Sequence, residues 1–543
     1  MVDVDPHYAA VAEAVRRGDR PQALNLAARA LKRGVNHPLV LVLAAEGLEE
    51  RGHAQPAIDL LRAATSAAPG HRVAWIRLAA LLARQRRFRE AAAAFNAVLD
   101  LDPDNYQALI GAGEMSLLLG DVPTAEQRYL RASEVTTGAA APLAVLAVIA
   151  AQRRDVAAAR DFAGRAEALE PGLVGAEMAL ARADLLDGDP ALAEARMRRA
   201  LMRADLDDDK RVGALDIRAT ALDALDQPAE AFADYAARNE IQRRIHGANF
   251  DMDAPERASS IARRQSVYLR QASPAAWRAA PGEDRAGARA VRGHVFLLGF
   301  PRSGTTLLEK ALSGHPSIIA LEEINHLARA TLDMPPDESG WRRLENLTEE
   351  EADLCRQTYW QCVHESHGAD LSDRWLLDKL PLHTLALPHI ARLFPTAKIL
   401  FALRDPRDVV LSCFRQRFQI NSAMFEFLTL EGAAGLYDAV MSLAVVARAT
   451  LALNVREVRH EAVVADFDAE VADILDFIGA GWDPAVRTFA DRVGGQARTP
   501  SYPQLARGLN ADGVGQWRRY QAQLAPILGR LEPWIARFGY PPS

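Results

Sequence analysis

The chain has 543 residues, of which 49% are hydrophobic and 25% charged, with a formal net charge of −7 at pH 7. The length predicts several domains, and the composition is that of an ordinary globular protein. The net negative charge argues against a nucleic-acid-binding protein, because such chains are generally basic. The three cysteines, Cys355, Cys362 and Cys413, are too few for a disulfide framework, and none is spaced like a zinc ligand pair.

The N-terminus, M-V-D-V-D-P-H-Y, is acidic and lacks the basic and then apolar pattern of a secretory signal. The most apolar stretch, residues 138–151, contains Pro142 and is shorter than the roughly 18 residues that a membrane span needs. We therefore expect no membrane span, no nucleic-acid partner and a cytoplasmic location.

The first half of the chain repeats with a period of 34 residues. A small or basic turn residue recurs at this interval, at Gly18, Gly52, Arg86, Gly120, Arg154 and Gly188. An alanine follows each turn residue by five positions, at Ala23, Ala57, Ala91, Ala125, Ala159 and Ala193. A seventh copy around Pro228 and Ala231 is displaced by four residues, which the acidic insert near 206–210 can absorb.

Each repeat predicts a pair of helices. In one unit, residues 105–118 carry apolar residues at helical spacing, Gly120 breaks the helix, and residues 122–133 form the next. The small alanine lets two antiparallel helices approach closely, and stacked pairs share one core. The period resembles the tetratricopeptide repeat family, with about seven units in a solenoid over residues 1–245.

This resemblance implies a concave surface that binds a peptide or a partner protein. Two alternatives remain open from the sequence. The array could serve only as a scaffold for the second half of the chain, or it could form a homodimer.

Residues 246–290 are polar and irregular and are predicted to be a linker, with a helical stretch around 255–272. The predicted second domain, 291–543, begins with a buried strand at 294–298. A tight loop from Gly299 to Gly304 and a helix N-terminus follow. This combination forms an anion site, because backbone N–H groups point into the loop and the helix dipole favours negative charge.

The loop has the spacing of a nucleotide P-loop, G-x-x-x-x-G-K-[ST], but Thr305 and Thr306 follow Gly304 where the lysine would stand. The positive charge lies inside the loop, at Arg302. The segment P-R-S-G-T-T resembles sulfotransferases that use 3′-phosphoadenosine 5′-phosphosulfate (PAPS). The resemblance implies that Arg302 and residues 303–306 hold the 5′-phosphosulfate, that is, Ser303, Gly304, Thr305 and Thr306.

A second motif lies in K-I-L-F-A-L-R-D-P-R-D-V-V-L-S at 398–412. It predicts a strand that ends at Arg404, an N-cap at Asp405 and a helix that begins at Pro406. The pattern R-D-P-R-D-x-x-x-S resembles the 3′-phosphate site of the same sulfotransferases. Arg404 and Ser412 would therefore bind the 3′-phosphate, which ATP lacks.

Further segments resemble the tyrosylprotein sulfotransferases within this family. L-L-D-K-L-P at 376–381 puts Lys379 at a strand end, and V-R-H-E at 458–461 has His460 in place of a tyrosine that contacts the nucleotide. Residues 498–505 and 513–520 are similar to the loop that closes over the 3′-phosphate and adenine. The candidates in and around these two segments are Arg498, Ser501, Arg507 and Arg518, and we choose Ser501 and Arg518.

The candidate general base lies in I-I-A-L-E-E-I-N-H at 318–326. In tyrosylprotein sulfotransferases the second glutamate of a pair at this place is the base, and it aligns with Glu323. The arginine that follows in that family is Asn325 here. His326 is an alternative base, since many other sulfotransferases use histidine, and Glu322 is a second alternative.

The expected fold class is an all-α tetratricopeptide-repeat solenoid followed by an α/β P-loop-like sulfotransferase domain with a mainly parallel sheet. The implied reaction moves the sulfuryl group of PAPS to a hydroxyl, with PAP as product, no metal, and Glu323, Lys379 and Arg302 as catalytic residues. A peptide or protein tyrosine, a saccharide and a small phenol are the candidate acceptors. The alternatives are a P-loop kinase acting on a hydroxyl and a repeat scaffold with an inactive nucleotide-binding domain.

Overall fold

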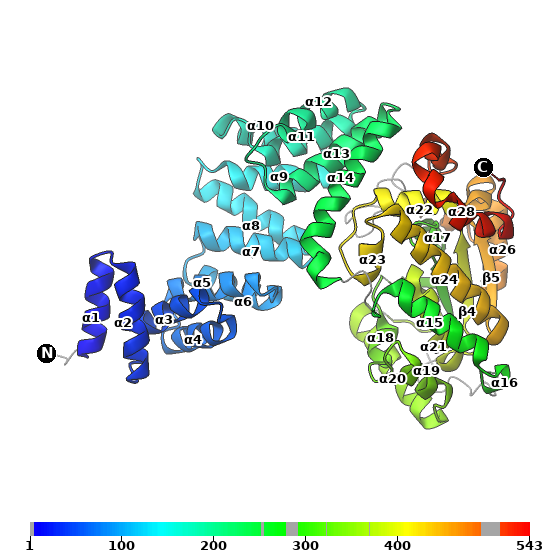
Figure 1. Cartoon of the computed structure of the whole chain (residues 1–543), viewed down its shortest axis with the longest axis horizontal. Coiled ribbons are helices and arrows are strands. Elements are labelled where there is room, and N and C mark those ends of the chain that lie inside the picture. Colours follow the sequence, from blue (N-terminus) through cyan, green and yellow to red (C-terminus); the bar gives the residue numbers. More distant parts are fainter. Residues whose placement is uncertain are drawn as a thin grey trace. The chain divides into compact units, whose positions relative to one another are not determined.

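The computed structural model describes residues 5–250, 255–277, 291–321, 323–368, 370–489 and 511–542. Glu322, Arg498, Ser501 and Arg507 lie outside these described residues. The chain divides into two compact units, Met1–Arg203 and Ala204–Ser543, and each is described by itself (Figure 1).

The described part of the first unit consists of helices and the turns between them. Consecutive helices pack as pairs, for example α3 with α4, α5 with α6, and α7 with α8. The helices are α1 (Pro6–Arg16), α2 (Arg20–Lys32), α3 (Pro38–Glu50), α4 (Ala54–Ala67), α5 (Arg72–Arg84), α6 (Phe88–Leu101), α7 (Tyr106–Leu118), α8 (Val122–Val135), α9 (Ala140–Gln152), α10 (Val156–Leu169), α11 (Val174–Leu186) and α12 (Pro190–Leu201). The pair predicted at 105–118 and 122–133 corresponds to α7 and α8.

The 34-residue period has a direct backbone cause. All six predicted turn residues have a positive φ, between 58° at Arg86 and 81° at Gly188. This left-handed conformation ends one helix and redirects the chain into the next, and glycine adopts it with the least strain. The six in-register alanines are all buried between helices, with at most 1% of their surface exposed. The predicted helical repeat is therefore confirmed.

The second unit begins with the helix pair that the sequence assigns to the seventh repeat. Its helices are α13 (Asp208–Ala224) and α14 (Pro228–His246), joined by a turn in which Asp226 has a φ of 58°. Next come α15 (Ala258–Gln271) and α16 (Pro274–Trp277). Within the stretch predicted as a linker, α15 packs along the long helix α24 (Leu430–Thr450).

The rest of the second unit surrounds a five-stranded parallel sheet with the order β2-β3-β1-β4-β5. The strands are β1 (Gly293–Gly299), β2 (Ile318–Leu321), β3 (Trp375–Lys379), β4 (Lys398–Leu403) and β5 (Asn454–Arg459). Because the strands are parallel, the residues that follow β1, β3 and β4 meet at one edge of the sheet. Ligands of open α/β sheets bind at this edge.

Successive side chains of β1 point to opposite faces of the sheet, and each face is covered by helices. Phe296 and Leu298 belong to the core that includes α24, whereas Val295 and Leu297 belong to a second core with α17 and α26. The helices and shorter helical turns are α17 (Thr305–Leu312), α18 (His326–Ala330), α19 (Glu338–Glu345), α20 (Glu349–His367), η2 (Pro381–Ala386), α21 (Leu387–Leu393), α22 (Pro406–Arg415), α23 (Ser422–Glu426), α25 (His460–Ala465), α26 (Phe467–Ile478), η3 (Pro484–Phe489), η4 (Gln516–Tyr520) and α28 (Gln521–Arg537).

Helix α24 is long and strongly apolar. Within the described ranges it is the one helix whose length and composition would allow it to cross a membrane, and 67% of the relevant window is buried inside the protein. It packs against α15, α22 and α28, as the central helix of a protein core does. The absence of a membrane span stays a prediction.

Candidate active site

The loop after β1 is shaped by two residues with left-handed backbone. Arg302 has a φ of 70° and Gly304 a φ of 95°. A Cβ atom at Gly304 would lie 2.6 Å from Nδ1 of His460, so glycine is required by both conformation and space. Helix α17 begins directly after this glycine. The predicted strand, loop and helix are all present, and His460 packs on the loop.

The two sequence motifs meet at this loop. Arg302 donates from Nε to Ser412 Oγ at 2.9 Å, and Arg404 donates from Nη1 to the carbonyl of Arg302 at 3.0 Å. Nε of Arg404 is buried and has no hydrogen-bond partner among the described residues. A buried guanidinium N–H without a partner fits an anionic ligand at this point. Arg302, Arg404, Ser412 and His460 thus form one cluster.

The electrostatics of the cluster favour an anion. Burial and the neighbouring Arg404 lower the pKa of Arg302 to about 10, so this guanidinium is still charged at neutral pH. Burial, followed by the two arginines, lowers the pKa of His460 to about 3. His460 is therefore a neutral imidazole beside two cations, and a bound phosphate or sulfate would relieve their repulsion.

A second cluster forms at the end of β3. The Lys379 side chain is 1% exposed, and its Nζ contacts Glu323 Oε1 and, at 2.9 Å, Glu309 Oε2. Glu323 is 37% exposed, whereas Glu309 is buried on α17 and also binds Lys310. The predicted pair of Lys379 and Glu323 is thus brought together, with Glu323 as the carboxylate that reaches solvent.

Glu309 is not among the site residues predicted from the sequence, although the sequence contains a signal for it. Thr305, Glu309 and Leu312 follow at i, i+4 and i+7 and therefore share one face of the predicted helix. A carboxylate on a face that otherwise packs inward implies a buried cationic partner. Lys379 is that partner.

The alternative base His326 is buried. Burial, followed by Arg329, lowers its pKa, and its Nε2 lies 3.4 Å from Ser366 Oγ. The exposed carboxylate of Glu323 is better placed to meet an acceptor than this ring is. Glu322, the other alternative, lies outside the described residues.

The segment after residue 511 contacts Arg404 through its backbone. The carbonyl of Gly513 accepts from Arg404 Nη2, and the amides of Gly515 and Trp517 donate to Asp408 at 2.7 and 2.8 Å. The predicted Arg518 is exposed, with its guanidinium 5.0 Å from the Trp517 ring centroid. Ser501 lies outside the described residues.

The described residues do not form a cluster with the composition of a metal site. Across the described ranges no group of three or more histidine, cysteine, aspartate or glutamate side chains could hold a metal ion. The three cysteines are buried and free.

A buried polar cluster includes Asp378, the residue before Lys379 in β3. Asp378 is fully buried and accepts a hydrogen bond of 2.6 Å from the Tyr359 hydroxyl, which lies 3.0 Å from Nε2 of His294. Burial raises the pKa of Asp378 to about 7. The folded protein therefore holds a proton at this position that the unfolded chain releases at lower pH.

Asp378→Asn should make stability less sensitive to rising pH. Between the ordinary aspartate pKa of about 4 and the raised value, the native state binds more protons than the unfolded state. The Asp378 contribution to stability is therefore lost as the pH rises through this window, and asparagine does not titrate. Urea unfolding at about pH 5 and about pH 8 checks this. Identical changes in wild type and variant would contradict it.

Parts of the chain are similar to known proteins. Residues 294–484 match the sulfotransferase family, and residues 48–112 match a tetratricopeptide repeat. Protein-tyrosine sulfotransferase A of Caenorhabditis elegans is 25% identical over 46% of this chain and 67% of its own length. Protein-tyrosine sulfotransferase 1 of Danio rerio is 24% identical over 46% of this chain and 72% of its own length.

Two further proteins match slightly smaller parts of this chain. An uncharacterized protein of Aquifex aeolicus (strain VF5) is 23% identical over 44% of this chain, which spans 33% of that protein. The solved structure of a tetratricopeptide repeat protein from Parabacteroides merdae, 17% identical, covers 43% of this chain and 91% of its own, with a TM-score of 0.35. By these family models, the N-terminal part of the chain is similar to tetratricopeptide repeats and residues 294–484 are similar to the sulfotransferase family.

Proposed function

We propose that the protein transfers the sulfuryl group of PAPS to an acceptor hydroxyl and releases PAP. The observation that carries the proposal is the cluster of Arg302, Ser412 and Arg404, because it joins a P-loop without lysine to a second cationic site. The loop amides and Arg302 would hold the 5′-phosphosulfate. Arg404, with its partnerless Nε, would hold the 3′-phosphate.

Glu323 accepts the proton of the acceptor hydroxyl, whose oxygen forms a bond to sulfur. The bond between sulfur and the 5′-phosphate oxygen breaks at the same time, and PAP leaves with the electron pair. Lys379, Arg302 and the amides of 303–306 stabilise the charge that develops on the leaving oxygen, which is usually the largest catalytic contribution. PAPS supplies the sulfuryl group, and these fixed cations and amides replace the metal of phosphoryl transfer.

The contact between Lys379 and Glu323 couples the two halves of this reaction. While Glu323 is ionised, the buried ammonium compensates its charge. When the carboxylate takes up the acceptor proton, that compensation is no longer needed, and the Lys379 charge is available to the leaving oxygen. Glu309 keeps the ammonium at the strand end throughout.

For the acceptor we propose a peptide or protein hydroxyl, with tyrosine as the first candidate. The proposal draws on the names of the C. elegans and D. rerio relatives and on the attached repeats, which would bind the acceptor protein. Asn325 stands where the tyrosylprotein enzymes have arginine, and its Oδ1 instead caps α18. Recognition of the acceptor should therefore differ from theirs.

Two measurements test this function. A thermal-shift comparison should show stabilisation by PAP without magnesium and little effect of Mg-ATP, because ATP lacks a 3′-phosphate; the reverse result would indicate the kinase alternative. Transfer of radiolabelled sulfate from PAPS should then be screened over tyrosine peptides, saccharides and phenols. Binding of PAP without transfer to any of these would indicate an inactive nucleotide-binding domain.

A further inference from the structure

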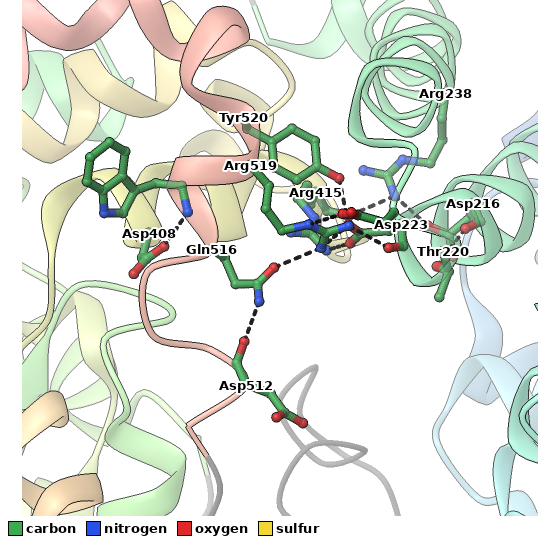
Figure 2. Close-up of polar contacts among 12 residues, drawn as sticks. Asp216, Thr220, Asp223, Arg238, Asp408, Arg415, Asp512, Gln516, Arg519 and Tyr520 are labelled. Atoms are coloured by element: carbon green, nitrogen blue, oxygen red, sulfur yellow. Dashed lines mark hydrogen bonds and ion pairs between the residues drawn. The ribbon is translucent and has the colours of Figure 1, made fainter. Parts of the chain in front are cut away.

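Polar contacts centred on Asp223 join the helix pair α13–α14 to helix α22 and to the segment 512–520 (Figure 2). Asp223 lies in the last turn of α13, and its side chain is 11% exposed. Its Oδ1 accepts from Arg519 Nη1 and from the Tyr520 hydroxyl, both at 2.9 Å, and its Oδ2 accepts from Arg415 Nη2. Arg519 also donates to the Asp223 carbonyl at 2.7 Å. One carboxylate thus holds two arginines and a tyrosine.

A chain of hydrogen bonds leads from this network to Arg404. Arg519 donates to Gln516 Oε1 at 3.2 Å, and Gln516 donates to the carbonyl of Asp512 at 2.7 Å. Asp408 holds the amides of residues 515 and 517, as described above, and the carbonyl of residue 513 accepts from Arg404. The segment 512–520 is therefore fixed at one end by Asp223 and contacts the predicted 3′-phosphate arginine at the other.

The same helix pair holds α22 by its last turn. Arg238 is fully buried and donates to the carbonyls of Phe414 and Arg415 at 3.1 and 3.0 Å, and Asn239 donates to Phe414 at 3.0 Å. A guanidinium on the C-terminal carbonyls satisfies groups that have no partner inside the helix and complements its dipole. Helix α22 carries Ser412 and begins two residues after Arg404, so both routes from the helix pair end at one site.

We propose that Asp223 is a positioning residue for the 3′-phosphate part of the donor site. Its charge keeps Arg415 and Arg519 together, which fixes the segment 512–520 and thereby the guanidinium of Arg404. Without the carboxylate the two arginines lose a common partner and repel each other, so the segment is released. The inference rests on the proposed function, because it assigns the 3′-phosphate to Arg404.

Asp223→Asn tests the proposal through binding rather than turnover. The affinity for PAP, measured by calorimetry on the full chain, should fall about tenfold, whereas the affinity for AMP should stay unchanged. The selectivity follows because the segment 512–520 contacts Arg404 directly, through the carbonyl of Gly513, and Arg404 is the arginine that would face the 3′-phosphate. A structural defect alone would weaken both ligands alike, and that result, like unchanged binding of PAP, would overturn the proposal.

Asp226→Asn is the matched control. Asp226 accepts from Nε of the same Arg519 at 2.9 Å but is 82% exposed, so its ion pair should contribute little. The affinity of the Asp226→Asn variant for PAP should equal that of the wild type. A loss of affinity as large as that of Asp223→Asn would contradict the role of the buried carboxylate.

Tyr520→Phe keeps the test usable if Asp223→Asn does not fold. It removes one hydrogen bond to Asp223 and leaves all charges in place, so PAP should bind roughly two- to fivefold more weakly, with AMP unaffected. Equal losses for the two ligands, or none, would overturn the proposal. Failure of the wild type to bind PAP would instead reject the proposed function, so the two failures are distinguishable.

Discussion

Glu323→Gln is expected to lower kcat roughly 10²–10⁴-fold, the usual effect of losing a general base. The Kd for PAP should hardly change, because Glu323 lies at the exposed side of Lys379 and not in the cluster of Arg302 and Arg404. Sulfate transfer from labelled PAPS to the best acceptor of the wild type gives kcat, and calorimetry with PAP gives the affinity.

Glu309→Gln separates the role of base from that of charge partner. Both glutamates contact Lys379, but only Glu323 reaches solvent. Glu309→Gln leaves the candidate base in place and removes only one charge partner of Lys379, so it should lower kcat less than Glu323→Gln does. If Glu323→Gln kept full activity, the base would have to be His326 or Glu322.

Arg404→Ala is expected to weaken binding of PAP roughly tenfold to a hundredfold, the range for a lost charge-assisted hydrogen bond. AMP, which lacks the 3′-phosphate, should lose little. The reason is that the buried Nε of Arg404 would donate to the 3′-phosphate and would have no ligand partner in the AMP complex. Calorimetric titration of both nucleotides measures the difference.

Arg417→Ala removes one positive charge at an exposed site beyond the end of α22 and serves as the control for long-range electrostatics. It should leave the ratio of the two affinities unchanged. Equal losses of PAP and AMP in Arg404→Ala would show that the 3′-phosphate is not bound there.

The repeat architecture could be predicted because its cause is local. A left-handed turn residue and a buried alanine recur at fixed spacing, so each copy supports the prediction of the next, even where Arg86 or Arg154 replaces glycine. The site motifs were predictable for a similar reason. Asp405 is the N-cap of α22, and Pro406 is its first residue, as the sequence indicated.

The partners of these motifs were not predictable, since they depend on contacts between distant parts of the chain. The contact of Glu309 with Lys379 requires α17 to lie against the end of β3, which no local pattern encodes. Asp223 ends a repeat helix and looks like an ordinary surface acid in the sequence. Only the folded unit shows that it binds two arginines and a tyrosine.

The strand order affects the order in which the parts of the chain fold. The central strand β1 pairs with β3 and β4, which come much later in the chain, whereas each repeat packs on its immediate neighbour. Contacts between residues close in sequence form quickly, and contacts between residues far apart in sequence form slowly. The repeats should therefore fold during synthesis, whereas β1 cannot pair until β3 and β4 have been synthesised. The contact of Arg404 with Gly513 spans 109 residues and that of Asp223 with Arg519 spans 296. The proposed donor site would therefore be completed late, and a nascent chain that stopped before residue 513 would have folded repeats but would lack the contact of Arg404 with Gly513.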